Sequence, residues 1–124
     1  MDSKDYHFGL LYLVHLLISA DGVLDEHEEK ELLKIRNKEQ IPSGTYAEFK
    51  EQIKTKKDRE IYQLGIEYIN KCSEEKKLDA FVHLYKMSEA DGTFHVKEVR
   101  LLLYSIKMAS IEFNDVVEKA KQSQ

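Results

Sequence analysis

Apolar residues recur along the chain at helical spacing and are separated by short polar connectors. The first run, from about Lys4 to Ser19, is apolar around nearly its whole circumference, which predicts a central, buried helix. A strongly polar run begins near Glu26 and ends before Pro42, whose ring and missing N–H stop helices, so it predicts a surface helix. Further helical patterns begin near Ser43, Asp58, Ser73, Val96 and Asn114 or Asp115. The pattern therefore predicts an all-α chain, a compact bundle of about seven helices.

The segment from about Val96 to Ala109 carries two apolar faces. The first consists of Val99, Leu102, Leu103 and Ile106, which we expect to face the core. The second consists of Leu101, Tyr104 and Met108. We expect this second face to be buried against the first or the fourth helix; the alternative is an exposed face that binds a partner.

One connector occurs twice. SADGVLDEHEEKELL, from Ser19 to Leu33, returns loosely as EADGTFHVKEVRLLL, from Glu89 to Leu103. Asp91 follows Asp21 by 70 residues, and Glu98 follows Glu28 by the same number. We call this separation of 70 residues the repeat offset. Gly22, and Gly92 in the second copy, can adopt the left-handed conformation that ends a helix. The repeat predicts two pseudo-symmetric helix-ADG-helix halves, about 4–38 and 74–110, within a single domain over residues 1–124.

The acidic residues of the connectors allow two interpretations, which stay open here. Asp25 and Glu28 have the spacing of a helix cap, but Asp21 faces the unfavourable negative end of the preceding helix dipole. Either its oxygens accept N–H bonds from the turn, or they bind a cation. Carboxylates are ligands for calcium or magnesium, and the candidates are Asp21, Asp25 and Glu28 in the first copy and Asp91 and Glu98 in the second. The second copy is poorer in acids, because His95 replaces Asp25.

Composition narrows the classes of function. A formal charge of -4 argues against a nucleic-acid partner, since such proteins usually present a basic face. The apolar run from Phe8 to Ala20 is too short to span a bilayer, which takes about 20 apolar residues, and no positively charged segment precedes it. Cys72 is the single cysteine, which fits a reducing compartment. We therefore expect a cytoplasmic protein that is not an integral membrane protein.

The sequence does not favour an enzyme. It contains neither a glycine-rich phosphate loop nor a nucleophile elbow, and HEEKE at His27 lacks the second histidine of a zinc-protease helix. His15 and His83 lie in largely apolar helices, where histidines are usually hydrogen-bonded core or boundary residues. Catalytic residues are therefore not expected.

The paired ADG-x-x-x-x-x-E connectors, each after an apolar helix, resemble those of the tellurite-resistance TerB-like family, whose relatives include the N-terminal domain of the co-chaperone DjlA. The resemblance covers most of the chain. It implies an all-helical domain with pseudo-twofold halves and acidic clusters that bind divalent metal. It also implies an interaction module of stress-response systems, often beside membrane proteins, with no common catalytic activity.

Three hypotheses of function follow, of which the third is an enzyme that would need an unsuspected constellation of histidine and acidic residues assembled by the fold. The first is a non-enzymatic helical interaction module of a TerB-like stress-response system, with a weak calcium or magnesium site at the first ADG loop and a protein partner that can itself be membrane-associated. The second is a purely structural or scaffold domain in which the ADG connectors only cap helices. Dependence on a divalent cation would separate the first two.

Overall fold

The computed structural model of the chain describes residues 3–18, 26–90 and 96–122. These residues form seven helices and no strand, which confirms the predicted all-α class. The helices are α1 (Ser3–Ile18), α2 (Glu26–Lys38), α3 (Ser43–Thr55), α4 (Asp58–Asn70), α5 (Glu74–Ala90), α6 (Val96–Met108) and α7 (Phe113–Gln122).

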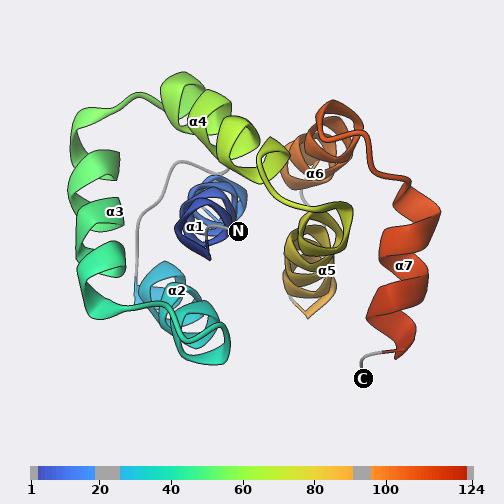
Figure 1. Ribbon diagram of the computed structural model, residues 1–124, viewed down its shortest axis with the longest axis horizontal. Helices are drawn as coiled ribbons and strands as arrows, with labels where there is room; N and C mark the ends of the chain where they lie inside the picture. Colours follow the sequence, from blue (N-terminus) through green and yellow to red (C-terminus); the bar gives the residue numbers. More distant parts are fainter. Residues whose placement is uncertain (1–2, 19–25, 91–95, 123–124) are drawn as a thin grey trace.

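Helix α1 is the centre of the fold. Figure 1 shows α2, α3 and α4 arranged around it, with α5 on its other side. Its side chains are buried on every face: Tyr6, Phe8, Leu10, Leu11, Tyr12, Leu13, Val14, Leu16 and Leu17. The prediction of a central helix from the all-round apolar pattern is therefore confirmed.

The closest contact of α1 is with α4, and two glycines permit it. A Cβ atom added at Gly9 would lie 2.7 Å from Cγ1 of Ile69, which is fully buried in α4. On the opposite helix, a Cβ at Gly65 would lie 3.1 Å from Leu13. Helix α4 therefore approaches α1 more closely than two alanines would allow.

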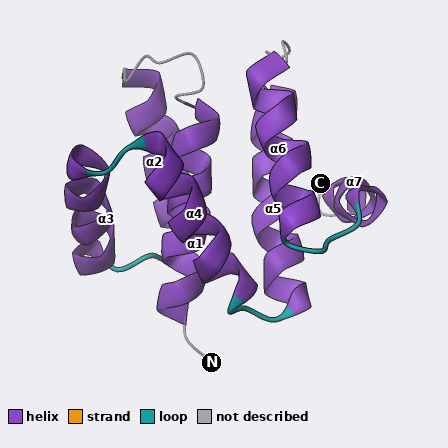
Figure 2. Cartoon of the chain, turned by 90° about the horizontal axis from the view of Figure 1, so that it is seen from above, coloured by secondary structure: helices purple, strands orange, loops and turns teal. Residues whose placement is uncertain are grey.

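The later part of the chain packs on α5. Phe81 and Leu84 of α5 and Val116 of α7 are buried, and the rings of Tyr85 and Phe113 meet edge to face with centroids 6.0 Å apart. Figure 1 shows α6 beside α5, and Figure 2 shows α7 nearly end-on where α5 and α6 are seen from the side, so that α7 lies across them. Helix α5 thus joins α7 to the part of the core built on α1.

The repeat offset also appears in the backbone at the ends of α2 and α6. Gln40 (φ 55°) and Ser110 (φ 59°) are the two described non-glycine residues with positive φ. The next residue donates its N–H back across the turn in both cases, from Ile41 to the Arg36 carbonyl at 2.9 Å and from Ile111 to the Ile106 carbonyl at 3.1 Å. This is the hydrogen bond of a Schellman helix stop.

The same register continues into the helices that follow these turns. Helix α3 begins at residue 43 and α7 at residue 113, which are again separated by the repeat offset. Pro42 stands before α3, but Glu112 stands before α7. Because α6 ends like α2 without a proline, the backbone turn itself is enough to stop the helix.

The prediction for the second face of α6 is wrong. Tyr104 is 59% exposed and Met108 is 49% exposed, and Leu103, which we expected in the core, is 45% exposed. Leu102 and Ile106 do face the core as predicted. Helix α6 packs on α5 and α1 through the side that carries Leu102 and Ile106, and the described residues about 100° around the helix from Leu102 are largely exposed. The side chain of Leu101 is outside the described part of the structure.

Candidate functional site

The predicted cation ligands lie in or beside the two ADG connectors, and the structure describes none of their side chains. Outside the described residues lie Asp21, Gly22, Asp25, Asp91 and Gly92. Glu28 and Glu98 belong to the first turns of α2 and α6, but their side chains are not described either. Among the described residues, no group of three or more His, Cys, Asp or Glu side chains is placed to hold a metal ion. The cation site at the connectors therefore stays a prediction.

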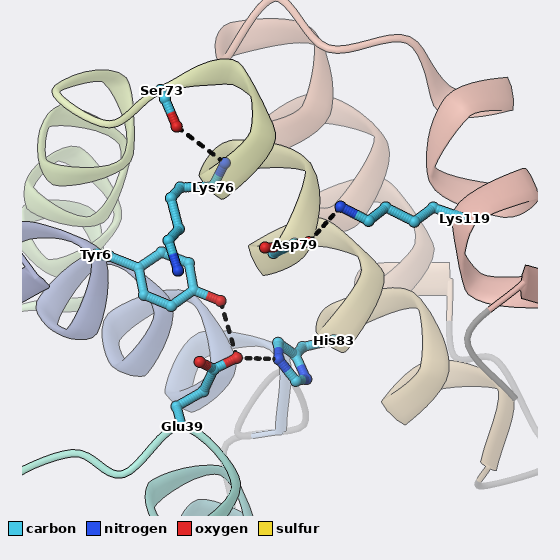
Figure 3. A network of polar contacts seen from close by, with 7 residues as sticks. All are labelled: Tyr6, Glu39, Ser73, Lys76, Asp79, His83 and Lys119. Carbon is cyan, nitrogen blue, oxygen red and sulfur yellow. Dashed lines mark hydrogen bonds and ion pairs between the residues drawn. The ribbon is translucent and has the colours of Figure 1, made fainter.

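A polar cluster joins three helices at a place that the sequence did not indicate. It consists of Tyr6 from α1, Glu39 directly after α2 and His83 from α5 (Figure 3). The Tyr6 hydroxyl donates to Oε2 of Glu39 at 3.0 Å, and the same oxygen lies 2.5 Å from Nε2 of His83. The ammonium group of Lys76 lies 4.9 Å from the centroid of the Tyr6 ring.

The electrostatics of this cluster favour an ionised Glu39. The hydrogen bond with His83 is the main cause that lowers the pKa of Glu39, and the Tyr6 hydroxyl and the Lys76 charge act in the same direction. Burial opposes them but does not reverse the shift. Burial, followed by the negative charge of Glu39, raises the pKa of Tyr6, so its hydroxyl stays protonated and donates.

A pocket of about 250 Å³ lies beside the cluster, between the end of α2 and the helices α5 and α7. Its described lining residues are Lys38, Glu39, Asp79, Val82, His83, Lys86 and Lys119. Both carboxylates in this lining already have partners, since Asp79 pairs with Lys119 at 2.5 Å and Glu39 with His83 (Figure 3). No Ser, Thr or Cys is among the described lining residues, so a nucleophile–base pair of the usual kind is not assembled here.

The cluster is therefore explained as a connection between helices. A half-buried carboxylate between a histidine and a tyrosine satisfies all three polar groups and ties α1, α2 and α5 together. The prediction that His83 is a hydrogen-bonded boundary residue is confirmed.

A second feature, the α4–α6 groove, lies on the surface between those two helices. We define it by the residues that line it, Tyr62 from α4 and Arg100, Leu103, Tyr104 and Lys107 from α6. The rings of Tyr62 and Tyr104 lie with centroids 6.0 Å apart at an angle of 43°. Tyr62 is half-buried, whereas the α6 residues are exposed. A shallow aromatic and aliphatic surface with a cation at either end has the chemistry of a surface that binds a partner.

Sequence reasoning missed this groove because we expected Tyr104 and Leu103 to be buried. The signal was present in the repeat itself. Lys34 and Lys38 of α2 precede Tyr104 and Met108 of α6 by the repeat offset. Lysine at both equivalent positions indicates that this face of the helix meets solvent.

Seven described helices, with matching turns after α2 and α6, define an all-helical domain. The chain belongs to the family of the tellurite resistance protein TerB, whose family model matches residues 7–121, nearly the whole chain. TerB is generally not a family of catalytic enzymes. Neither the curated proteins nor the solved structures contain a significant match. Within the described residues, none of the helices combines the length and apolar character needed to cross a bilayer.

Proposed function

We propose that this chain is a non-enzymatic helical interaction module of a TerB-type stress-response system. The observation that carries the proposal is the exposed apolar side of α6, where Leu103, Tyr104 and Met108 are each at least 45% exposed. Large apolar side chains that gather on a surface commonly mark a site of protein association. Membership of the TerB family supports a binding rather than a catalytic role.

Site-specific crosslinking tests this proposal without assuming which face is used. A photoreactive phenylalanine analogue replaces one exposed residue at a time on four different helices: Leu33, Glu67, Tyr104 and Lys121. Each variant is expressed in cells of the source organism, irradiated and analysed by mass spectrometry. We expect one of these positions to give a reproducible crosslink to a specific protein while the others do not. If no position gives a specific crosslink, the chain is better described as a scaffold, and the proposal fails.

The proposal includes a weak divalent-cation site at the first ADG connector. Asp21, Asp25 and Glu28 supply three carboxylates close together in sequence, and carboxylates are the ligands that calcium and magnesium prefer. If Asp21 follows the end of the first helix as the sequence predicts, a cation there would compensate for its charge at the negative end of the helix dipole. It would also fix the direction in which α2 leaves α1.

Thermal unfolding of the metal-stripped chain tests the cation site. A cation that binds only the folded state raises the midpoint, since it stabilises by RT ln(1 + [L]/Kd). We expect calcium or magnesium at about millimolar concentration to raise the midpoint and Asp21→Asn to abolish the rise. Asp58→Asn, at an exposed residue of α4, is the matched control and should keep it. An unchanged midpoint with both ions would leave the connectors as helix caps alone.

A further inference from the structure

The α4–α6 groove has a cation at each end. Arg100, the pair Leu103 and Tyr104, and Lys107 follow one another at one-turn intervals along the exposed side of α6. Neither Arg100 nor Lys107 forms an ion pair with a described residue. The chain as a whole carries a net charge of -4, so two such cations beside an apolar groove do not simply reflect a basic protein. The electrostatic complement of this surface is an acidic one.

The other half of the chain provides an internal comparison for this surface. At the repeat offset, the α2 counterparts of Leu103 and Tyr104 are Leu33 and Lys34, and the counterpart of Lys107 is Asn37. Leu33 is 40% exposed, close to the 45% of Leu103. Since a lysine is accepted at the equivalent helix position, the fold does not require an aromatic residue at 104. The extra apolar surface is therefore a property of this one face.

A second copy of this chain is a poor occupant of the groove. In a symmetric dimer with antiparallel α6 helices, Arg100 of one copy would face Lys107 of the other, and two such like-charge contacts would oppose association. An amphipathic helix can place an apolar side chain into the groove and a charged one a turn away on either side.

We propose that the α4–α6 groove binds an amphipathic helix of a partner protein, whose apolar residues contact Tyr62, Leu103 and Tyr104 and whose Asp or Glu residues pair with Arg100 and Lys107. This proposal rests on the interaction function given above and specifies the surface and the chemistry of the partner. The apolar contacts supply most of the affinity, and the flanking charges select the partner and its direction along the groove.

A display experiment with the full chain tests the groove. The probe is a library of helical peptides on yeast, with randomised surface positions, selected for binding to the chain. We expect the enriched peptides to carry apolar residues at helical spacing with acidic residues one turn before and after them. Leu103→Ser should weaken their binding by at least about tenfold. Leu33→Ser, the equivalent change in α2, should not change it. Tyr104→Lys serves as a second variant, because Lys34 already occupies the equivalent position in this fold.

Charge reversal tests the acidic nature of the partner. In the double variant Arg100→Glu/Lys107→Glu, the selection should switch from acidic to basic flanking residues. The matched double variant Lys30→Glu/Asn37→Glu changes the equivalent positions of α2 and should keep the acidic preference. Circular dichroism of each variant confirms that a loss of binding is not a loss of folding.

Several outcomes would overturn the groove proposal. Peptides that bind Leu103→Ser and Tyr104→Lys as well as the unsubstituted chain would place the binding surface elsewhere and leave the interaction function standing. Association with phosphatidylserine vesicles that Leu103→Ser abolishes, without any peptide enrichment, would point to a membrane surface. A dimer in sedimentation that Leu103→Ser dissociates would point to a second copy. Failure of the interaction function itself is measured separately, by the absence of specific crosslinks from all four tested helices.

Discussion

Replacing Gly9 by alanine adds one methyl group at the place where α1 and α4 come closest. The new Cβ would lie 2.7 Å from Cγ1, 2.8 Å from Cδ1 and 3.1 Å from the backbone nitrogen of Ile69. Ordinary carbon–carbon contacts lie at about 3.5–4.0 Å. Ile69 is fully buried and its backbone nitrogen belongs to α4, so the side chain cannot simply swing away and the helices must separate. Overpacking of this kind costs about 1–3 kcal/mol.

Part of this cost is offset, because alanine is about 1 kcal/mol more favourable than glycine inside a helix. The net expectation for Gly9→Ala is a loss of up to about 2 kcal/mol in the free energy of unfolding. The matched control is Gly44→Ala near the start of α3, where the added Cβ meets no atom within 4 Å. That substitution should leave stability unchanged or raise it by up to about 1 kcal/mol.

Guanidinium unfolding followed by circular dichroism measures both variants. Removing the clashing side-chain atoms should relieve the strain, so Ile69→Ala should cost about 2–5 kcal/mol in the unsubstituted chain and clearly less in the Gly9→Ala background. If Gly9→Ala is as stable as Gly44→Ala, or if the effects of Gly9→Ala and Ile69→Ala are simply additive, the argument that close helix approach requires Gly9 is refuted.

Three further predictions concern other parts of the fold. The pKa of Glu39 is lowered in the folded chain, so the ionised carboxylate stabilises the fold at pH values above its ordinary pKa of 4.5. This stabilisation is lost as the pH falls through the lowered pKa of the folded chain. Glu39→Gln should therefore be less stable than the unsubstituted chain near neutral pH, with a difference that shrinks in acid; a difference independent of pH in urea unfolding would contradict this. Gln40→Gly and Ser110→Gly should each raise the free energy of unfolding by about 0.5–1 kcal/mol, because both residues have positive φ. A lower melting temperature in either variant would show that the native side chain contributes more than the backbone strain costs. Leu103→Ser should change the free energy of unfolding by less than about 0.5 kcal/mol, because Leu103 is exposed. Leu102→Ala should cost about 2–5 kcal/mol, because Leu102 is buried. Comparable losses from the two variants would mean that Leu103 belongs to the core.

The helices and their approximate ends were readable from sequence because their signals are local. The all-round apolar pattern of α1 predicted its central position, and the polar pattern of α2 predicted a surface helix. The helix stop at Gln40 was not predicted in its actual form. Glutamine with positive φ has no sequence signature, and Pro42 offered a simpler explanation for the end of the helix.

The orientation of α6 could not be predicted from its own residues. Four consecutive apolar positions, Leu101 to Tyr104, cover more than half of the helix circumference, so the pattern does not select one buried face. Contact with α5 and α1 makes the selection by burying Leu102 and leaving Leu103 and Tyr104 exposed. Comparison with α2 would have indicated the exposure of Tyr104, whose equivalent is Lys34, but not that of Leu103, whose equivalent is Leu33.

The polar cluster was also beyond local reasoning. Glu39 is 33 residues from Tyr6 and 44 residues from His83 in sequence, and only the packing of three helices brings them together. The predicted cation ligands are of a different kind, since they lie close together in sequence. Their arrangement depends on connectors outside the described residues, so that part of the site stays a prediction.

The matching turns at Gln40 and Ser110 indicate what this architecture constrains most strongly. Between the two halves most side chains differ, yet the turns and the helix starts after them keep the same repeat offset. Chain length between turns therefore matters more than residue identity. Deleting a single residue within α2 would rotate everything after it by about 100° about the helix axis and carry Phe49 away from the Tyr12 ring, 5.7 Å from it in the native fold. An insertion or deletion inside a helix therefore disturbs this fold in a way that a single surface substitution does not, whereas a length change in a connector leaves the helix phase intact.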